Sequence, residues 1–354
     1  MRNRRFELSE LRAPIVQAPM AGGPSTRELA VAVCRAGGLG FLAAGYRPAQ
    51  AVREDIDAVR AATGGPFGVN LFVPAAEPAD PARLRDYLRE LAPEAERQRV
   101  QLGEPRSDDD GWQAKLELVC EKQVPVVSFT FGCPAADEIG RLHAAGSAAW
   151  ITVTSPDEAR LAQDAGADAL VVQGTEAGGH RGGFVDDRRF DGLGLLALLR
   201  LVARSASAPL IASGGISDGA AIAAVLCAGA SAAQIGTAFM LCPEAGTVDS
   251  HRALLTQPVP TALTRAFTGR LARGLVNRFL ADHTATAPIA YPEIHHATAP
   301  LRAAARKRGD TDGFNLWAGQ THELAQPLPA GELVRRLVAD ARRTLDWEGR
   351  RRPI

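Results

Sequence analysis

An apolar segment runs directly into a glycine-rich loop in Val171-Val172-Gln173-Gly174-Thr175-Glu176-Ala177-Gly178-Gly179-His180-Arg181-Gly182-Gly183. A strand that is buried on both faces of a parallel barrel should be almost wholly apolar, and residues 169–172 fit that description. The polar Gln173 then marks the carboxyl end of the strand, which is where barrel enzymes place their active sites. The pattern therefore predicts a buried parallel strand with a site loop at its mouth.

The loop itself is rich in glycine around a single histidine. Gly178, Gly179, Gly182 and Gly183 allow positive φ and let the backbone approach a flat ligand closely. His180 has little side-chain bulk beside it in the sequence, and a histidine titrates near neutral pH, which suits a general base. The alternative interpretation is a flexible surface loop with a solvated histidine. We expect His180 to be catalytic.

Seven further strand patterns repeat the same rhythm of strand, loop and helix. Eight such units predict an α/β protein, a closed (β/α)8 TIM barrel. The expected strands begin near residue 15 and continue at 39–44, 66–73, 124–129, 148–153, 169–173, 209–213 and 232–235.

The 354 residues exceed the roughly 250 of a typical barrel, so about 100 remain for a small second domain. The rhythm breaks at residues 75–110 and again at 243–312, and we assign both segments to a small, mainly helical substrate-side domain. Residues 1–74, 111–242 and about 313–354 then form the barrel and its C-terminal helix. Helical spacing is expected at 82–101, 273–280, 291–308 and 333–345.

Charge and hydropathy narrow the class of partner. Forty Lys and Arg residues balance forty Asp and Glu residues, which argues against a nucleic-acid or anionic-membrane binder. No apolar run approaches the ~18 residues of a membrane span, and the basic start is followed by no apolar signal region. We expect a cytoplasmic protein, a monomer or homodimer, that acts on a small molecule.

No residue grouping indicates a metal. The five cysteines lack CxxC spacing, the acidic cluster Asp108-Asp109-Asp110 is typical of a solvated loop, and the adjacent His295 and His296 point to different faces of a helix. Cys133 follows a predicted strand, so a nucleophile is conceivable, but a packing cysteine is commoner there.

Two glycine turns favour a phosphate site. Ser213-Gly214-Gly215 follows the seventh strand and Gly236-Thr237 follows the eighth, the two places where barrels commonly bind phosphate. Bare glycines expose backbone N–H groups, and the helix that begins near Asp218 adds its positive end. Two ordinary tight turns are the alternative. Together with polar Asn70 and Gln173 at the barrel mouth, the turns suggest FMN.

A dinucleotide-binding domain is not expected. The relaxed fingerprints at residues 38–43 and 192–197 lie outside a strand-to-helix turn, which the phosphate-binding mechanism requires.

The segments 17–23 (QAPMAGG), 174–182 (GTEAGGHRG) and 212–219 (ASGGISDG) resemble the nitronate monooxygenases, formerly called 2-nitropropane dioxygenases. The resemblance implies an FMN-dependent barrel with a small second domain and His180 as the catalytic residue. In some members a tyrosine and a lysine stand where we place His295 and Ala299, so this chain departs from the family on its substrate side.

The same resemblance implies roles for individual residues. The flavin would lie against Met20, Ala21, Gly22, Gly178 and Gly179, with Asn70 and Gln173 at its polar edge and Ser213, Gly214, Gly215, Gly236 and Thr237 around its phosphate. The substrate side would be formed by Tyr291, His295, Trp317 and Gln320.

Three functions are compatible with these features. The first is an FMN-dependent nitronate monooxygenase that uses O2 to convert alkyl nitronates, and as a further candidate nitroalkanes, to carbonyl compounds and nitrite. The second is an FMN-dependent NAD(P)H reductase of the enoyl-acyl-carrier-protein or quinone reductase type. The third is a flavin-binding accessory protein, in which a histidine within an open glycine loop is harder to explain.

Overall fold

Eight parallel strands form a nearly closed, TIM-like barrel, as predicted. The computed structural model describes residues 5–74, 79–187 and 192–348. The sheet runs in the order β1-β9-β8-β6-β5-β4-β3-β2, and a parallel bridge between Val16 and Leu39 joins its two edges. The barrel strands are β1 (Ile15–Gln17), β2 (Phe41–Ala43), β3 (Gly68–Phe72), β4 (Val126–Thr130), β5 (Ala148–Val153), β6 (Ala169–Gln173), β8 (Leu210–Ser213) and β9 (Ala232–Ile235).

Neighbouring residues of each strand enter different apolar clusters. Val171 belongs to a small cluster that includes Phe41 and Trp150 and fills the barrel interior, whereas Leu170 and Val172 pack outward against the helices. This alternation follows from the two-residue period of a strand, and burial on both sides explains the apolar run in β6.

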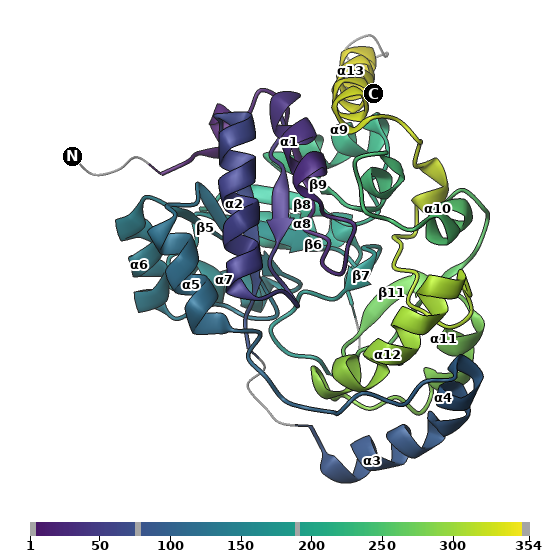
Figure 1. Cartoon of the computed structure of the whole chain (residues 1–354). Helices are drawn as coiled ribbons and strands as arrows, with labels where there is room; N and C mark the ends of the chain where they lie inside the picture. Colours follow the sequence, from purple (N-terminus) through teal and green to yellow (C-terminus); the bar gives the residue numbers. More distant parts are fainter. Residues whose placement is uncertain (1–4, 75–78, 188–191, 349–354) are drawn as a thin grey trace.

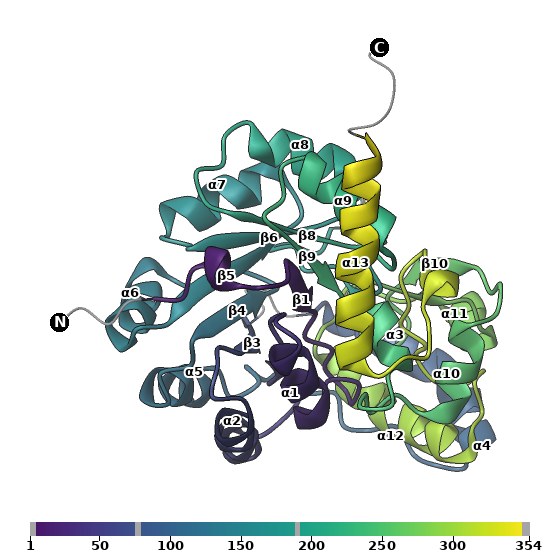
Figure 2. The same ribbon diagram turned by 90° about the horizontal axis from the view of Figure 1, so that it is seen from above.

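The outer layer consists of helices that follow the barrel strands, namely α1 (Arg27–Arg35), α2 (Ala49–Thr63), α5 (Trp112–Glu121), α6 (Ala136–Ala145), α7 (Pro156–Asp164), α8 (Leu195–Ala203) and α9 (Gly219–Cys227). Several begin at a side-chain cap: Ser155 accepts from Glu158 N, and Asp218 accepts from Ala221 N. The C-terminal α13 (Ala330–Glu348) packs on α9 and α1, and Figure 2 shows it lying along α9.

The remaining helices gather beyond the carboxyl ends of the strands (Figure 1). They are α3 (Pro81–Glu90), α4 (Ala92–Gln98), α10 (Asp249–Leu255), α11 (Arg278–His283) and α12 (Glu293–Arg308). Tyr87, Phe267, Phe279 and Ile294 form a separate buried cluster among them. The predicted boundary at residue 74 adjoins residues 75–78, which lie outside the described part of the chain.

This region also contains a small antiparallel sheet that the sequence did not predict. Its strands are β10 (Thr261–Thr264), β11 (Ala272–Leu275) and β7 (Gly179–His180). The helix expected at 273–280 is therefore wrong in its first half, because β11 pairs with β10 on one side and with the site loop on the other. Tertiary pairing outweighs local helix propensity there.

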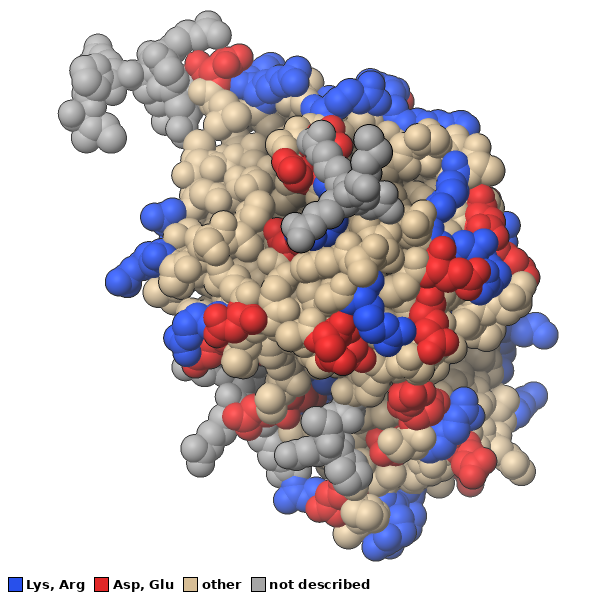
Figure 3. Space-filling model, turned by 90° about the vertical axis from the view of Figure 1, so that its left-hand side faces the viewer, with Lys and Arg blue, Asp and Glu red and all other residues tan. Residues whose placement is uncertain are grey.

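No helix in the described residues is long and apolar enough to cross a membrane. On the face shown in Figure 3, acidic and basic side chains are interspersed, in keeping with the balanced charge of the chain.

Candidate active site

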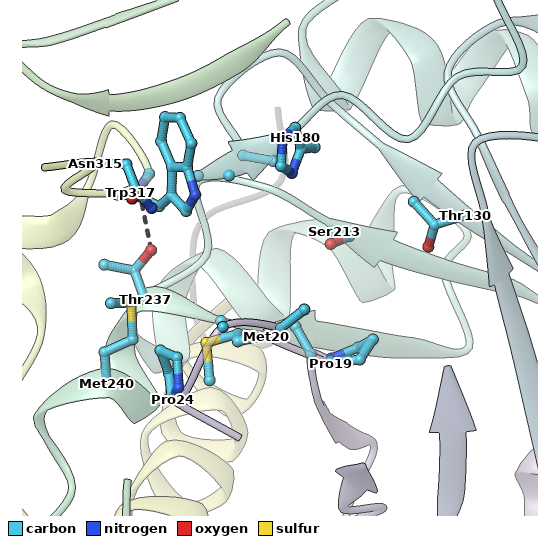
Figure 4. Close-up of a pocket in the computed structure, with 18 of the residues that line it drawn as sticks. Pro19, Met20, Pro24, Thr130, His180, Ser213, Thr237, Met240, Asn315 and Trp317 are labelled. Atoms are coloured by element: carbon cyan, nitrogen blue, oxygen red, sulfur yellow. Dashed lines mark hydrogen bonds between the residues drawn. The ribbon is translucent and has the colours of Figure 1, made fainter. Parts of the chain in front are cut away.

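A cavity of about 310 Å³ opens at the carboxyl ends of the barrel strands, beneath the helices and the small antiparallel sheet that gather there. Figure 4 shows His180 and Trp317 on one side of this space and Pro19 and Met20 on the other. The cavity brings together nearly all the site residues predicted from the sequence, namely Met20, Ala21, Gly22, Asn70, Gln173, Gly178, Gly179, His180, Ser213, Gly214, Gly215, Gly236, Thr237, His295 and Trp317.

Two predicted substrate-side residues lie elsewhere. Gln320 is exposed, and its backbone N–H donates to Glu176 O at 3.0 Å. Tyr291 stands behind the cavity wall, with its ring centroid 5.9 Å from that of His180 and its hydroxyl donating to Tyr46 OH at 3.2 Å. Tyr291 therefore supports the histidine without lining the cavity.

Close backbone packing explains the glycines of the site loop. A Cβ at Gly178 would lie 2.5 Å from Gly319 N, so the segment at Trp317 could not approach. Gly179 has a φ of +74°, which L side chains rarely adopt. The next residue, His180, pairs with Ala272 of β11, and this pairing fixes the direction of its side chain.

Aromatic rings from distant parts of the chain enclose His180, although its neighbours in the sequence carry little bulk. Its ring centroid is 5.5 Å from that of Phe131 and 5.6 Å from that of Trp317. Burial, followed by the positive charges of Arg270 and Arg302, lowers the pKa of His180 from 6.5 to about 3. The imidazole is therefore neutral at physiological pH.

Thr268 is the hydrogen-bond partner of this imidazole. Its Oγ1 lies 2.9 Å from His180 Nε2 and 3.2 Å from Arg270 O, and the residue is 2% exposed. Thr268 lies in the turn between β10 and β11, the hairpin whose second strand also pairs with His180. When His180 is protonated, this hydroxyl can accept its Nε2–H while donating to the carbonyl oxygen of Arg270.

Polar side chains at the strand ends form the floor of the cavity. Gln173 Nε2 donates to His180 O at 3.1 Å, and its Oε1 accepts from Gly182 N at 2.8 Å, so this amide braces the loop. Asn70 Nδ2 donates to Ser128 Oγ at 2.9 Å and to Thr130 Oγ1 at 3.0 Å. Ser128 and Thr130 also line the cavity and were missed, although polar residues at the end of a predicted strand could have revealed them.

The two glycine turns offer free backbone donors. Gly214 and Gly215 have φ of +115° and +65°, and no hydrogen bond described in the structure uses their N–H groups or that of Thr237. Thr237 Oγ1 accepts from Gly319 N at 3.0 Å, which ties the turn to the segment bearing Trp317. Free N–H groups beside the capped start of α9 are suited to a phosphate.

The model of the nitronate monooxygenase family matches residues 5–340 of the chain. The chain belongs to the nitronate monooxygenase family. It is thus an enzyme, an oxidoreductase of a family that typically depends on flavin.

Similar proteins cover nearly the whole chain. A nitronate monooxygenase of Pseudomonas aeruginosa is 44% identical over 351 residues, which are 97% of this chain and 100% of that protein. One from Paraburkholderia phytofirmans is 42% identical, over 94% of this chain and 93% of the other. The crystal structure of nitroalkane oxidase from Streptomyces ansochromogenes is 50% identical, with a TM-score of 0.94 over 96% of this chain and 99% of the other. FabK from Thermotoga maritima is 26% identical, with a TM-score of 0.77 over 97% of this chain and 96% of the other.

In this nitronate monooxygenase family member, the helices beyond the strand ends contribute side chains to the cavity that were not predicted from the sequence. The ring of His295 stacks on Tyr46 with centroids 3.9 Å apart, and Arg302 reaches the cavity from the same helix, α12. His295 was predicted for the substrate side, but Tyr46 and Arg302 were not. No local signal marks those two residues, because only the packing of α12 over the barrel brings them together at the site.

Other candidates from the sequence have structural roles. Burial raises the pKa of Cys133 to about 11, so its thiol is a poor nucleophile. The acidic cluster is not simply solvated, because Asp110 pairs with the buried Lys115 at 2.7 Å and Asp108 lies 2.7 Å from His296. Within the described residues, no three potential metal ligands lie close enough together to hold an ion.

Proposed function

We propose that the chain is an FMN-dependent nitronate monooxygenase that uses O2 to oxidise alkyl nitronates to carbonyl compounds and nitrite. The observation that carries this proposal is a neutral, enclosed histidine facing a cavity that also contains two glycine turns with free N–H groups. The histidine provides a base, and the two glycine turns provide a place for a phosphate.

The residues present fit FMN. The turns at Ser213–Gly215 and at Gly236–Thr237 would hold its phosphate, and a Cβ at Gly236 would already touch Met20 Sδ at 3.7 Å. Residues 20–22 and the glycines at 178–179 would line its ring, with Asn70 nearby. When bound, FMN supplies the electron-accepting and oxygen chemistry.

His180 in this proposal accepts the carbon-bound proton of a nitroalkane. The lowered pKa leaves the imidazole unprotonated at neutral pH, and the same burial makes it a weaker base, so proton transfer depends on groups that stabilise the imidazolium. The rings of Phe131 and Trp317 exclude water from the imidazole, and Thr268 Oγ1 makes a hydrogen bond with its Nε2. A nitronate that enters already deprotonated needs no such step, and His180 then only orients it.

An assay on the purified protein tests the proposal. We expect acid-released flavin to be FMN and oxygen uptake to depend on ethyl nitronate without NAD(P)H. Released FAD would contradict the assignment of a single phosphate site. NAD(P)H oxidation with no nitronate-dependent oxygen uptake would instead support the FMN-dependent reductase, and bound flavin with neither activity would support the accessory protein.

A variant separates catalysis from flavin binding. His180→Asn removes the base but leaves the turns intact, so the flavin content should remain. Turnover of nitroethane should fall by roughly 10²–10⁴-fold, the usual contribution of a general base, and ethyl nitronate should suffer less. Full flavin content with unchanged rates on both substrates would reject His180 as the base.

A further inference from the structure

We propose that Arg302 binds the negative charge of the substrate, contacting the nitronate oxygens through its guanidinium. This inference rests on the proposed function, since it names the residue that recognises the anion in the same cavity.

Arg302 is a buried cation with no anionic partner among the residues that the structure describes. It is 8% exposed, and its hydrogen-bond partners are neutral: Nε donates to Thr298 Oγ1 at 3.0 Å and Nη2 donates to His295 O at 2.8 Å. Nη1 has only a 3.4 Å contact with Asn315 Oδ1. No carboxylate of the described residues lies within 4.0 Å of this guanidinium. Burial lowers the pKa of Arg302 to about 10, so it stays charged at neutral pH.

Buried charges in proteins are normally paired, because removing an ion from water is costly. The described residues that line the cavity include Arg302 and Arg306 but no aspartate or glutamate. The cavity thus concentrates positive charge that its own side chains do not neutralise. An anionic ligand supplies the missing partner.

Arg302 and the base face the same space. Its Nη2 lies 3.3 Å from Nδ1 of His295, whose ring stacks on Tyr46 in the cavity wall. The charge of Arg302 also contributes to the lowered pKa of His180, as a nearby cation must. Proton removal at carbon places negative charge on two oxygens, and a planar guanidinium suits such a pair.

The flavin phosphate would be a different anion, held by other residues. Its predicted turns follow β8 and β9, whereas Arg302 lies beside His295 and Tyr46, and Tyr46 follows β2. Flavin affinity should therefore be independent of Arg302.

The test measures anion binding without turnover. Inorganic nitrate, a planar oxyanion, is titrated into the flavin-loaded enzyme and followed by flavin absorbance. Arg302→Met should raise the nitrate Kd and the KM for ethyl nitronate by roughly 10–100-fold, the usual loss for a hydrogen bond to a charged group. The KM for neutral nitroethane should change far less. Lys307→Met, which removes an exposed charge from the same helix, is the matched control and should change none of these values.

Arg302→Lys keeps the charge but loses the planar fork, so its nitrate Kd should lie between those of wild type and Arg302→Met. This variant keeps the test decisive if Arg302→Met does not fold. An unchanged nitrate Kd in either folded variant would overturn the proposal. A loss confined to nitronates that also bear a carboxylate would assign Arg302 to that other group, and lost flavin would assign it to the cofactor; both outcomes reject the proposal. Nitrate binding that depends on Arg302 in an enzyme without nitronate oxidation would uphold the anion site while the proposed function fails.

Discussion

Thr268→Val removes the hydroxyl beside His180 and little else. Valine has nearly the same shape, and Thr268 is only 2% exposed, so water cannot easily replace the lost group. The substitution deletes the 2.9 Å contact with His180 Nε2 and the 3.2 Å bond to Arg270 O. The imidazole stays in place, because Phe131 and Trp317 still enclose it.

The size of the effect follows from the protonated state. His180 already resists protonation, since burial and two arginines lower its pKa to about 3. Once both ring nitrogens carry a proton, Nε2–H needs an acceptor, and Thr268 Oγ1 lies 2.9 Å from it. A hydrogen bond to a charged group contributes about 1.5–3 kcal/mol, which corresponds to roughly 10–150-fold in rate. The pKa of His180 should fall further in the variant.

The assay compares kcat/KM for nitroethane with kcat/KM for ethyl nitronate. We expect the loss on nitroethane alone, because only that substrate requires His180 to become protonated. Thr268→Ser, which retains the hydroxyl, should recover most of the rate. Equal losses on both substrates, or no recovery by serine, would show that Thr268 only shapes the turn and would refute the reasoning.

Three further outcomes are expected. Gly178→Ala should cost about 1–3 kcal/mol by overpacking and reduce flavin content, measured by thermal unfolding and absorbance, because its Cβ would meet backbone atoms at 2.5 Å. Lys115→Met should destabilise by about 3–5 kcal/mol in urea titrations, since it leaves Asp110 without its cation, and adding Asp110→Asn should recover part of the loss. Acidification should lower the melting temperature below about pH 6.5, because three buried histidines stay neutral in the native state but bind protons in the unfolded chain. Each of these histidines lowers the free energy of unfolding by about 1.4 kcal/mol per pH unit in this range, and above pH 6.5 its contribution is constant. These histidines, with pKa values lowered to about 3, 4 and 2 by burial, are His180, His251 and His295.

Local patterns were sufficient for the barrel. A buried parallel strand must be apolar on both faces, so the apolar run at residues 169–172 predicts β6 without any knowledge of its neighbours in the fold. Polar residues at strand ends and glycines after strands mark the mouth for the same reason, because the carboxyl ends of parallel strands meet at one edge. The cavity that collects Gln173, Ser213 and Thr237 was therefore predictable from the sequence.

Local patterns failed where the partner is distant in the chain. Residues 273–280 were predicted as a helix, but the first of them belong to β11 (Ala272–Leu275), since pairing with β10 and with the site loop outweighs propensity.

The sequence by itself determined which residue could act as the base and where glycines open the backbone, because both depend on side-chain chemistry and short-range geometry. Only the tertiary structure decided the protonation state of that histidine. His180 lies 88 residues from Thr268 and 122 from Arg302 in the chain, and the fold brings one within 2.9 Å and the other into the same cavity. Burial and the field of neighbouring charges set a pKa, and both arise only when such distant segments pack together.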